Sequence, residues 1–426
     1  MKSKTIGDYV DLQRGTTYKS ALLDQPGPYL LGLGSIERDG GFRSDKLKTY
    51  GGPSADKLLV YPGDMYVSLK DVTQSGDLLG SIARVPSTIK VGRMTQDTVK
   101  LCFKSEIPQN YFYWLLRTPQ YRQHCRSHAT GTTNLGLSRD DFFSFPIPEL
   151  TERRKSITAL LEDVESKMVL NTQTNQTLEE MAQAIFKSWF VDFDPVKAKM
   201  NGEQPEGMDE ATAALFPDQL VESELGLIPE GWNIKSIKDF GKVITGKTPP
   251  QEIDCAYSES GVPFITPTDI DSDVFVANTK RFLSESGVEA VKKNLLPEGS
   301  ICVTCIGSQM GKTVIAPSVS ASNQQINSIV TKKRYVRNFL FLNLRRRREE
   351  IFLIGSSGST MPIINKSTFE KLKVVAPAEI ILKTFDEIMF PLLDKIYQNA
   401  FENQMLSTLR DTLLPKLLSG EIDLEG

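Results

Sequence analysis

The chain has few of the residues from which metal and redox centres are built. Its 426 residues include only 2 His and 5 Cys. His124 and His128 are four residues apart, but the triplet between them lacks the Glu of a zinc protease. Cys302 and Cys305 form one CxxC pair, which cannot complete a tetrahedral site alone. We therefore expect no metal site, and an odd, unclustered set of cysteines indicates a reducing compartment in which none has to pair.

Long apolar runs are absent as well. No stretch approaches the roughly 18 apolar residues of a membrane-spanning helix, and residues 1–8 lack the apolar segment of a signal peptide. Both absences predict a cytoplasmic protein that contacts no membrane. With 40% hydrophobic and 24% charged residues, the composition excludes a disordered or fibrous chain, and the length predicts two or three domains.

The net charge is only −3, which argues against a nucleic-acid-binding protein until the charge is divided along the chain. Residues 1–150 carry 19 Lys and Arg against 15 Asp and Glu, and residues 233–378 carry 20 against 13. Residues 151–232 carry 7 against 16, and residues 379–426 carry 4 against 9. Two basic segments thus alternate with two acidic ones, which indicates that the basic segments face a polyanion. Chance clustering of solvated charge is the alternative.

An internal repeat is the strongest feature of the sequence. The offset between matching segments stays between 227 and 236 residues, which is too long for a solenoid repeat and indicates two copies of a whole domain. The matching pairs are 6–17 with 237–248, 27–36 with 261–270, 62–68 with 298–304, 111–116 with 339–344, and 131–142 with 358–369.

Each copy ends in a segment with the seven-residue repeat of a coiled coil. The first seam comprises Ile157, Leu161, Val164, Met168, Asn171, Asn175, Leu178, Ala182, Ile185 and Trp189. The second, 228 residues later, comprises Phe385, Met389, Leu392, Ile396, Asn399, Asn403, Leu406, Arg410, Leu413 and Leu417. We expect two helices of about 52–57 Å that pair with each other, with the asparagines facing one another to fix the register. In the alternative, the asparagines face solvent.

Proline and acidic residues mark two irregular places. Pro391 predicts a bend in the second long helix, or a helix whose regular part begins near this residue. Residues 193–232 are acidic and rich in Pro, Gly and Met. They predict a linker with one short helix near residues 208–215.

Three motifs carry a family resemblance that covers essentially the whole chain. They are FKSWFVDFDPV at 186–196, IPEGW at 228–232 and LRDTLLPKLLSGEI at 409–422. Together with the duplication, they make the chain resemble the specificity (S) subunit of bacterial type I restriction–modification systems. Many relatives open the first long helix with a Gln, whereas this chain has Glu-Arg-Arg at 152–154. This departure concerns only the start of that helix.

The resemblance implies a mixed α/β (α+β) protein with two target-recognition domains and two long antiparallel coiled-coil helices, related by approximate two-fold symmetry. The expected division is 1–150 for the first recognition domain, 151–192 for the first long helix, 193–232 for the linker, 233–378 for the second recognition domain and 379–426 for the second long helix.

The resemblance also implies a function without catalysis by this chain. Each recognition domain would read one half of a bipartite, asymmetric site in double-stranded DNA, and the helices would set the spacer. The helices would dock two methyltransferase subunits, which use S-adenosylmethionine to methylate adenine N6, and two restriction subunits that use ATP and Mg would complete the system. This chain itself would bind no cofactor.

Two alternatives stay open. One is an S-type subunit that serves a methyltransferase only. The other is a duplicated P-loop ATPase, because residues 307–313 (GSQMGKT) resemble a phosphate-binding loop. That loop has three residues between its glycines where the motif has four.

Candidate DNA contacts are basic, hydroxyl and amide side chains near the repeated loops, because Lys, Arg, Ser and Thr contact phosphates while Arg, Asn and Gln read bases. In the first copy they are Arg14, Thr16, Thr17, Lys19, Lys70, Arg93, Gln96, Arg122, Arg126, Thr132, Thr133, Asn134 and Arg139. In the second they are Thr245, Lys247, Thr248, Ser308, Gln309, Lys312, Gln324, Gln325, Arg345, Arg346, Arg347, Arg348, Ser359 and Thr360. The alternative for any one of them is a solvated loop side chain.

Candidate contacts with partner subunits are apolar residues of the long helices. They are Trp189, Phe190, Phe193, Leu413 and Leu417. The aromatic cluster at 189–193 is more apolar than one seam needs to bury, which predicts a docking surface and poor solubility of the isolated chain.

Overall fold

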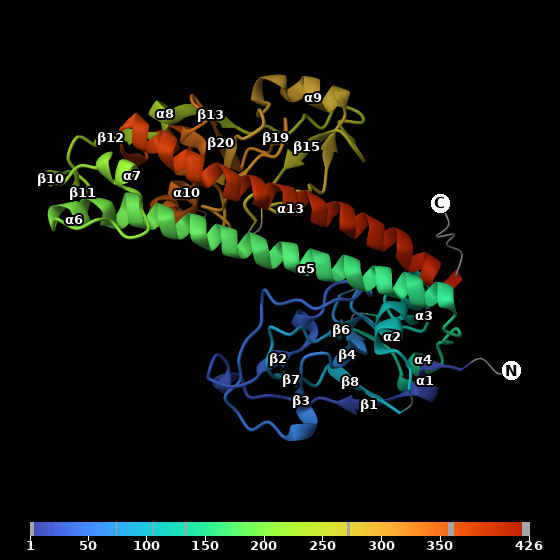
Figure 1. Ribbon diagram of the computed structural model, residues 1–426. Helices are drawn as coiled ribbons and strands as arrows, with labels where there is room; N and C mark the ends of the chain where they lie inside the picture. Colours follow the sequence, from blue (N-terminus) through green and yellow to red (C-terminus); the bar gives the residue numbers. More distant parts are fainter. Residues whose placement is uncertain are drawn as a thin grey trace. The chain divides into compact units, whose positions relative to one another are not determined.

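The computed structural model describes residues 4–73, 75–104, 106–132, 134–270, 273–356 and 362–419. They form two compact units (Figure 1): unit 1 contains Met1–Lys167 and Leu406–Gly426, and unit 2 contains Met168–Met405. Within the described ranges, no helix combines the length and apolar character that a membrane crossing needs.

Unit 1 contains the first copy of the repeated domain. Its strands are β1 (Val10–Arg14), β2 (Tyr29–Leu31), β3 (Leu59–Val60), β4 (Met65–Ser68), β5 (Lys70–Asp71), β6 (Ile82–Arg84), β7 (Gly92–Met94), β8 (Thr98–Phe103) and β9 (Leu135–Gly136). Its short helices are α1 (Ile6–Tyr9), α2 (Gln109–Leu115), α3 (Pro119–Ser127) and α4 (Arg139–Phe143), with 3₁₀ turns η1 (Ser20–Leu22), η2 (Leu33–Ser35) and η3 (Asp56–Leu58). The main sheet is antiparallel with the order β1-β8-β4-β6.

Unit 2 contains the second copy. Its strands are β10 (Leu220–Ser223), β11 (Gly226–Pro229), β12 (Asn233–Ser236), β13 (Gly241–Thr245), β14 (Tyr257–Ser258), β15 (Val262–Ile265), β16 (Phe282–Leu283), β17 (Ile301–Thr304), β18 (Thr313–Ile315), β19 (Ala321–Ser322), β20 (Ile326–Thr331) and β21 (Lys373–Ala376). Its short helices are α6 (Asp194–Met200), α7 (Glu210–Ala214), α8 (Ile237–Phe240), α9 (Glu285–Val291), α10 (Val336–Arg346), α11 (Arg348–Ser356) and α12 (Lys366–Glu370), with the 3₁₀ turn η5 (Lys292–Asn294). The main sheet is again antiparallel, with the order β13-β20-β17-β18.

The duplication seen in the sequence is therefore also a duplication of topology. Strands β1, β8, β4 and β6 correspond one by one to β13, β20, β17 and β18. The one-turn helices that precede β1 and β13 are both closed by a capping box, in Thr5 with Asp8 and in Ser236 with Asp239. The predicted mixed α/β fold with two copies of one domain is confirmed.

Each of two long helices has one part in unit 1 and the other part in unit 2. They are α5 (Glu152–Lys187), which ends in a π-helical turn η4 (Ser188–Asp192), and α13 (Glu379–Ser419). Pro391 lies inside α13, exposed at the surface of an uninterrupted helix. Because proline has no N–H, one carbonyl of the preceding turn has no intrahelical donor. The regular part of the helix does not begin at this proline.

In unit 2 the two helices run antiparallel, and the asparagines face each other. Asn399 Nδ2 donates to Asn175 Oδ1 at 2.8 Å, and Asn171 Nδ2 donates to Asn403 Oδ1 at 2.9 Å. Asn171 is 2% exposed and Asn399 is 1% exposed. The prediction that these residues pair inside the seam is confirmed, and the alternative that they face solvent is wrong.

In unit 1 the other ends of the helices contribute to the core of the first domain. Ile157 and Leu161 of α5 and Leu413, Leu414 and Leu417 of α13 belong to one buried cluster with the aromatic residues of α2. Arg154 of α5 donates to the backbone oxygens of Leu417 (3.1 Å) and Leu418 (2.6 Å). These bonds satisfy carbonyls that a helix end leaves without partners.

Residues 193–232 are folded, contrary to the expected linker. The segment contains α6, α7 and the β10–β11 hairpin. Phe216 and Trp232 are buried in the main cluster of unit 2, where their rings contact those of Trp189 and Phe190. The linker prediction relied on the acidic composition and gave no weight to these few large apolar residues. Their burial is enough to order the segment. The short helix expected near residues 208–215 is present as α7.

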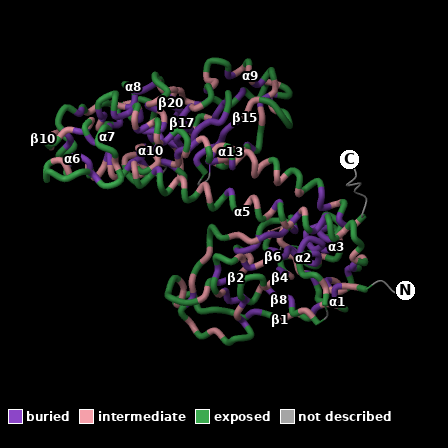
Figure 2. The backbone as a smooth tube through the Cα atoms, in the orientation of Figure 1, coloured by how far each residue is buried: buried purple, intermediate pink, exposed green. Residues whose placement is uncertain are grey.

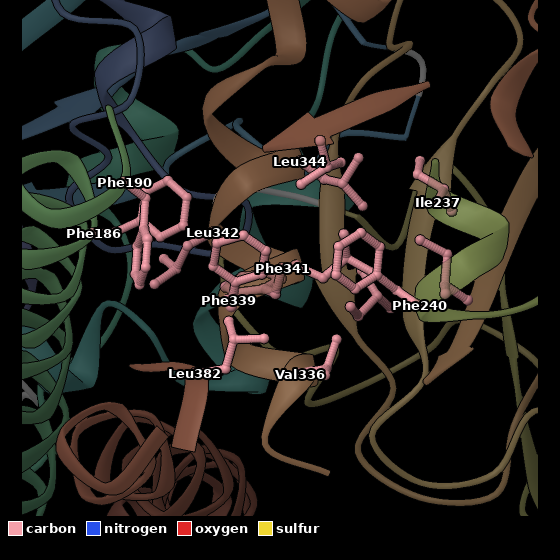
Figure 3. Packing of buried hydrophobic residues seen from close by; sticks show 14 of the residues in the cluster. Phe186, Phe190, Ile237, Phe240, Val336, Phe339, Phe341, Leu342, Leu344 and Leu382 are labelled. Atoms are coloured by element: carbon pink, nitrogen blue, oxygen red, sulfur yellow. The ribbon is translucent and has the colours of Figure 1, made fainter. Parts of the chain in front are cut away.

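The main core of unit 2 joins the long helices to the second domain (Figure 2 shows the buried positions). Figure 3 shows Phe186 of α5 and Phe190 of η4 pointing toward Phe339 and Leu342 of α10, with Leu382 of α13 nearby. This packing fixes α10 against the helices, so that the sheet of the second domain has a rigid support.

Candidate nucleic-acid interface

The candidate residues of the first copy gather at one end of its main sheet. Arg14 ends β1 and pairs with Val99, and Ser68 ends β4 and pairs with Thr98 at the start of β8. Because these strands are antiparallel, the loops that follow β1 and β4 leave the sheet at the end where β8 begins. We call this set of loops, residues 14–19, 69–71, 95–97, 130–132 and 134–136, loop end A.

Contacts join these loops to one another. Arg14 Nε donates to the Gln96 backbone oxygen at 3.4 Å, and Lys70 Nζ lies 3.2 Å from Asp97 Oδ1. Lys70 also pairs with Gly136 through the β5–β9 ladder, which brings residues 134–136 to the same place. The predicted residues that lie exposed on loop end A are Arg14, Thr16, Thr17, Lys19, Lys70, Gln96, Thr132 and Asn134. Basic, hydroxyl and amide groups on converging loops are the groups that contact phosphates and base edges.

Arg93 has a different role from the one predicted. Its side chain is 3% exposed, so it cannot reach DNA in this conformation. Its Nη2 donates to Thr16 Oγ1 and to the Thr17 backbone oxygen, both at 3.0 Å, and its guanidinium lies 4.8 Å from the centre of the Tyr50 ring. Tyr50 Oη in turn accepts a hydrogen bond from the Lys19 backbone N–H at 3.4 Å. Arg93 is thus a positioning residue that holds loop 16–19.

Arg122 and Arg126 both bind acceptors of their own domain, but only Arg122 is buried. Arg122 is 2% exposed and donates to the backbone oxygens of Leu79 (2.5 Å) and Asp77 (2.7 Å). Arg126 Nη2 lies 2.7 Å from Asp39 Oδ1. The prediction of DNA contact is therefore corrected for Arg122, whose buried guanidinium serves acceptors of its own domain. Arg126 is exposed and stays a predicted contact. Arg139 is exposed at the first residue of α4.

The second copy repeats the arrangement at the matching end of its sheet. Thr245 ends β13 opposite Asn327, and Thr304 ends β17 opposite Ile326 at the start of β20. We call residues 245–248, 305–312 and 323–325 loop end B. Thr245 Oγ1 donates to Asn327 Oδ1, and Thr248 Oγ1 donates to Gln324 Oε1, each at 2.7 Å. The exposed candidates there are Lys247, Thr248, Ser308, Gln309 and Gln324, while Thr245, Lys312 and Gln325 are half-buried.

The loop that resembles a P-loop is a turn between β17 and β18. Gly307 and Gly311 have φ values of 87° and 85°, and the Thr304 hydroxyl donates to the Gln309 backbone oxygen at 2.6 Å. Lys312 Nζ donates to the Ile270 backbone oxygen at 2.7 Å. The lysine that would hold a phosphate in a P-loop therefore ties this turn to its own domain, which disfavours ATP binding.

The arginine run at 345–348 divides between structural and exposed side chains. Arg345 lies 2.6 Å from Glu179 of α5 and donates to the Thr313 backbone oxygen at 3.0 Å. Arg347 lies 2.6 Å from Glu350. Arg346 and Arg348 are exposed. Arg345 and Arg347 thus hold α10 in place, and as DNA contacts they are corrected.

Three predicted residues lie outside the described part of the chain: Thr133, Ser359 and Thr360. The sequence reasoning in turn missed Tyr50, Asp97 and Asn327, whose contacts order loop ends A and B. Tyr50 follows a stretch without periodicity, and Asn327 lies inside a buried strand. Neither position carries a sequence signal that separates it from an ordinary core or loop residue.

The apolar residues predicted to dock a partner are mostly buried within the chain. Trp189 and Phe190 are each 6% exposed, Leu413 is 6% exposed and Leu417 is 0% exposed, and Phe193 packs edge-to-face on Trp232 at 5.7 Å. This correction follows from the folded segment 193–232, which covers the aromatic cluster. The expectation of poor solubility loses its motivation for the same reason.

The remaining candidates for chemistry are the CxxC cysteines and a metal site. Burial raises the pKa of the Cys302 and Cys305 thiols to about 11, so both are neutral thiols near pH 7. Across the residues with described positions, no group of three or more His, Cys, Asp or Glu is placed to hold a metal ion.

Two copies of one domain, each presenting basic, hydroxyl and amide side chains on converging loops, define a nucleic-acid recognition protein built by duplication. A family model described as the type I restriction modification DNA specificity domain matches residues 229–410. The chain is 33% identical over 359 residues to the HindI specificity subunit of Haemophilus influenzae, covering 74% of this chain and 78% of that protein. It is 26% identical over 333 residues to the MjaIX specificity subunit of Methanocaldococcus jannaschii, covering 76% and 71%.

A solved structure shows the same fold. The S subunit of a type I restriction–modification system from M. genitalium superposes with a TM-score of 0.60 at 15% identity, covering 98% of this chain and 95% of that one. The chain belongs to the family of type I restriction–modification specificity subunits. It is the DNA-recognition subunit of such a system, as the sequence motifs predicted.

Proposed function

We propose that each copy of the domain reads one half of a bipartite, asymmetric site in double-stranded DNA. One observation carries this proposal: loop ends A and B are built from the same strands in the same order, yet they present different side chains. The matched positions hold Arg14 against Thr245, Thr16 against Lys247, and Asp97 against Gln325. A shared frame with different contacts is what two readers of different half-sites require.

The long helices supply the rest of the proposed function. They dock two methyltransferase subunits, which use S-adenosylmethionine to methylate adenine N6, and they set the spacer between the half-sites. Two restriction subunits that use ATP and Mg join the full system, and this chain contributes recognition without catalysis. Outside the seam, both helices carry apolar side chains that stay exposed, among them Val169 (48%), Leu170 (57%) and Met405 (74%), which supports contact with another subunit.

An S-type subunit that serves only a methyltransferase is the second candidate. The chain has the same tasks in both systems, so the presence of a restriction subunit decides between them. The duplicated P-loop ATPase is disfavoured because Lys312 is engaged with the Ile270 backbone oxygen.

Methylome sequencing of cells that express this chain with its cognate methyltransferase tests the proposal. We expect methylated adenines in one split motif with two specified halves and a fixed spacer. Cells with the methyltransferase alone are the control. A continuous motif, or methylation that does not depend on this chain, would contradict the proposal.

Exchanging residues 1–150 for the equivalent part of a relative separates the two readers. We expect one half of the methylated motif to change and the other half to stay the same, because each copy has its own loop end. A change in both halves, or in neither, would show that the two copies do not read independently.

A further inference from the structure

Each copy of the domain contains a short 3₁₀ turn outside the candidate DNA contacts, η3 before β4 in the first copy and η5 before β17 in the second. At an offset of 236 residues, which also relates residues 62–68 to 298–304, Lys57 of η3 corresponds to Lys293 of η5. The residues on either side of the two lysines differ between the copies. The matched lysine is therefore what the two turns share.

In the first copy the turn lies beside loop end A. Leu59, the residue after η3, pairs with Arg93 of β7, and β7 runs on into residues 95–97 of loop end A. Because the two strands are antiparallel, the residues just before Leu59 lie beside that continuation. Cα atoms of η3 also lie within 8 Å of Cα atoms of β1, the strand that enters loop end A. Lys57 is thus a neighbour of the proposed DNA-contacting loops.

The second copy places its turn in the same way. Leu296 forms an antiparallel bridge with Ser320, and the chain after Ser320 leads into loop end B. A direct hydrogen bond then ties the turn to that loop end, because Nδ2 of Asn294 donates to the Thr245 backbone oxygen at 2.9 Å. Lys293 precedes Asn294, so this lysine too lies next to the loops of its own copy.

The ammonium groups of both lysines are available to a ligand. Lys57 and Lys293 are exposed, and neither ammonium group has a salt bridge or hydrogen bond to another residue in the described ranges. Lys292 differs, since its Nζ lies 3.2 Å from Glu289 Oε2. A cation that its own chain does not neutralise, beside loops with basic, hydroxyl and amide groups, is suited to a DNA phosphate.

The occurrence of the lysine in both copies favours a phosphate contact over base reading. The proposed function assigns a different half-site to each copy, so side chains that read bases should differ between the copies, as Arg14 and Thr245 do. The phosphate backbone is present in every sequence and carries no sequence information directly. A residue that binds it can therefore be the same in both readers.

We propose that Lys57 and Lys293 each bind a backbone phosphate of double-stranded DNA, one at each half-site. The two contacts fix the position of loop ends A and B on the duplex, whatever bases those loops read. The inference rests on the proposed function, because it takes loop ends A and B as the surfaces that face the DNA.

The salt dependence of DNA binding tests the proposal. The complex of the complete chain with its cognate methyltransferase is titrated, at several salt concentrations, with duplexes that carry or lack the methylated motif. Lys57→Gln and Lys293→Gln should each lower the slope of log affinity against log salt by about 0.9 in magnitude, and the double variant by about twice as much, because each phosphate contact releases counterions. Affinity for both duplexes should fall by a similar factor, and the methylated motif should stay the same.

Two kinds of control separate a phosphate contact from other effects. Lys90→Gln and Lys235→Gln remove the same charge from exposed positions ahead of β7 and in β12, away from the loop ends, and should leave the slope unchanged. The variant Lys57→Arg with Lys293→Arg keeps both charges and should keep the wild-type slope.

Glutamine variants whose slopes equal those of the lysine controls would overturn the proposed contacts. A changed half of the methylated motif, or a slope that also falls in the arginine variant, would overturn them as well. In these cases a split motif with the wild-type complex would still support the proposed function. A wild-type complex that methylates no split motif would overturn the proposed function and this inference together.

Discussion

At the scale of single residues, some candidate side chains are placed to contact DNA directly, whereas others position the loops that carry such contacts. Arg93 illustrates the second case, since its guanidinium is buried between Tyr50 and the 16–19 loop. An arginine in a basic segment is the first choice for a phosphate contact. The fold instead uses Nη2 to bind two oxygens of one loop while the planar guanidinium lies over the Tyr50 ring, an arrangement for which lysine is a poor substitute.

Replacing Arg93 with Lys should therefore disturb recognition through the loop. We expect the affinity for the cognate DNA to fall by about tenfold and the first half of the methylated motif to become less strictly specified, while the second half stays fixed. Competition binding and methylome sequencing measure the two effects. Lys90→Gln, an exposed change in the same domain, is the control. An unchanged first half would show that Arg93 does not position the reading loop.

Thiol reactivity gives a second expectation for single residues. Cys102 and Cys255 are exposed, whereas Cys125, Cys302 and Cys305 are buried, and burial raises the pKa of Cys302 and Cys305 to about 11. Iodoacetamide at pH 8 should therefore label Cys102 and Cys255 first, because the thiolate is the reactive form. Peptide mass spectrometry of the native chain measures the order, and denatured chain gives the reference rates. Early labelling of Cys302 would contradict the described burial.

At the scale of helices and strands, the paired asparagines determine how the long helices align. Asn399 and Asn175 share a hydrogen bond inside a seam that is otherwise largely apolar. Such pairs cost stability relative to leucine, but they favour one register. A one-turn slip would leave buried amides without partners, at a cost of about 1–3 kcal/mol each.

Asn399→Ala should lower the free energy of unfolding by about 1–3 kcal/mol, because Asn175 loses its partner. Urea denaturation followed by circular dichroism measures this loss. Gln398→Ala on the exposed side of the same helix should change stability by less than about 0.5 kcal/mol. The double variant Asn175→Leu with Asn399→Leu should recover or exceed the wild-type stability. If Asn399→Ala behaves like Gln398→Ala, the amide pair does not hold the seam together.

The long helices were the elements that the sequence predicted best, because a seven-residue pattern held over many turns has few other solutions. Helix α13 begins at Glu379, where the second helical segment was expected to begin. The 193–232 segment was the poorest prediction, since its order depends on Phe216 and Trp232 meeting an aromatic cluster far away in the sequence. The loop positions at the two sheet ends followed from the repeat. To distinguish Arg93 and Arg122 from exposed cations, the burial of each side chain has to be known, and a single sequence does not give it.

For the whole molecule, the lengths of α5 and α13 are expected to determine the distance between the half-sites. Inserting four residues between Thr174 and Leu178 lengthens α5 by about 6 Å, and one base pair occupies about 3.4 Å of duplex. We expect the spacer to grow by one or two base pairs with the specified bases unchanged, together with some loss of stability from the stutter in the seam. Methylome sequencing compares the spacers.

A mirror insertion between Met405 and Leu406 should act in the same direction if both helices span the gap. A four-residue insertion in the exposed hairpin at residues 224–225 is the control and should leave the spacer as it is. An active α5 insertion variant with an unchanged spacer would show that the helices serve only as a docking surface.

The last turns of α13 also bear on how the chain folds as it is made. Leu413, Leu414 and Leu417 complete the core of the first domain, and Arg154 binds the backbone oxygens of Leu417 and Leu418. The ribosome synthesises that domain first, yet the residues that close its core are among the last to emerge. The N-terminal half of the nascent chain must therefore wait with an exposed apolar surface, during which chaperones and proteases have access to it. A stop codon a few residues before Leu413 would thus damage the domain encoded at the opposite end of the gene.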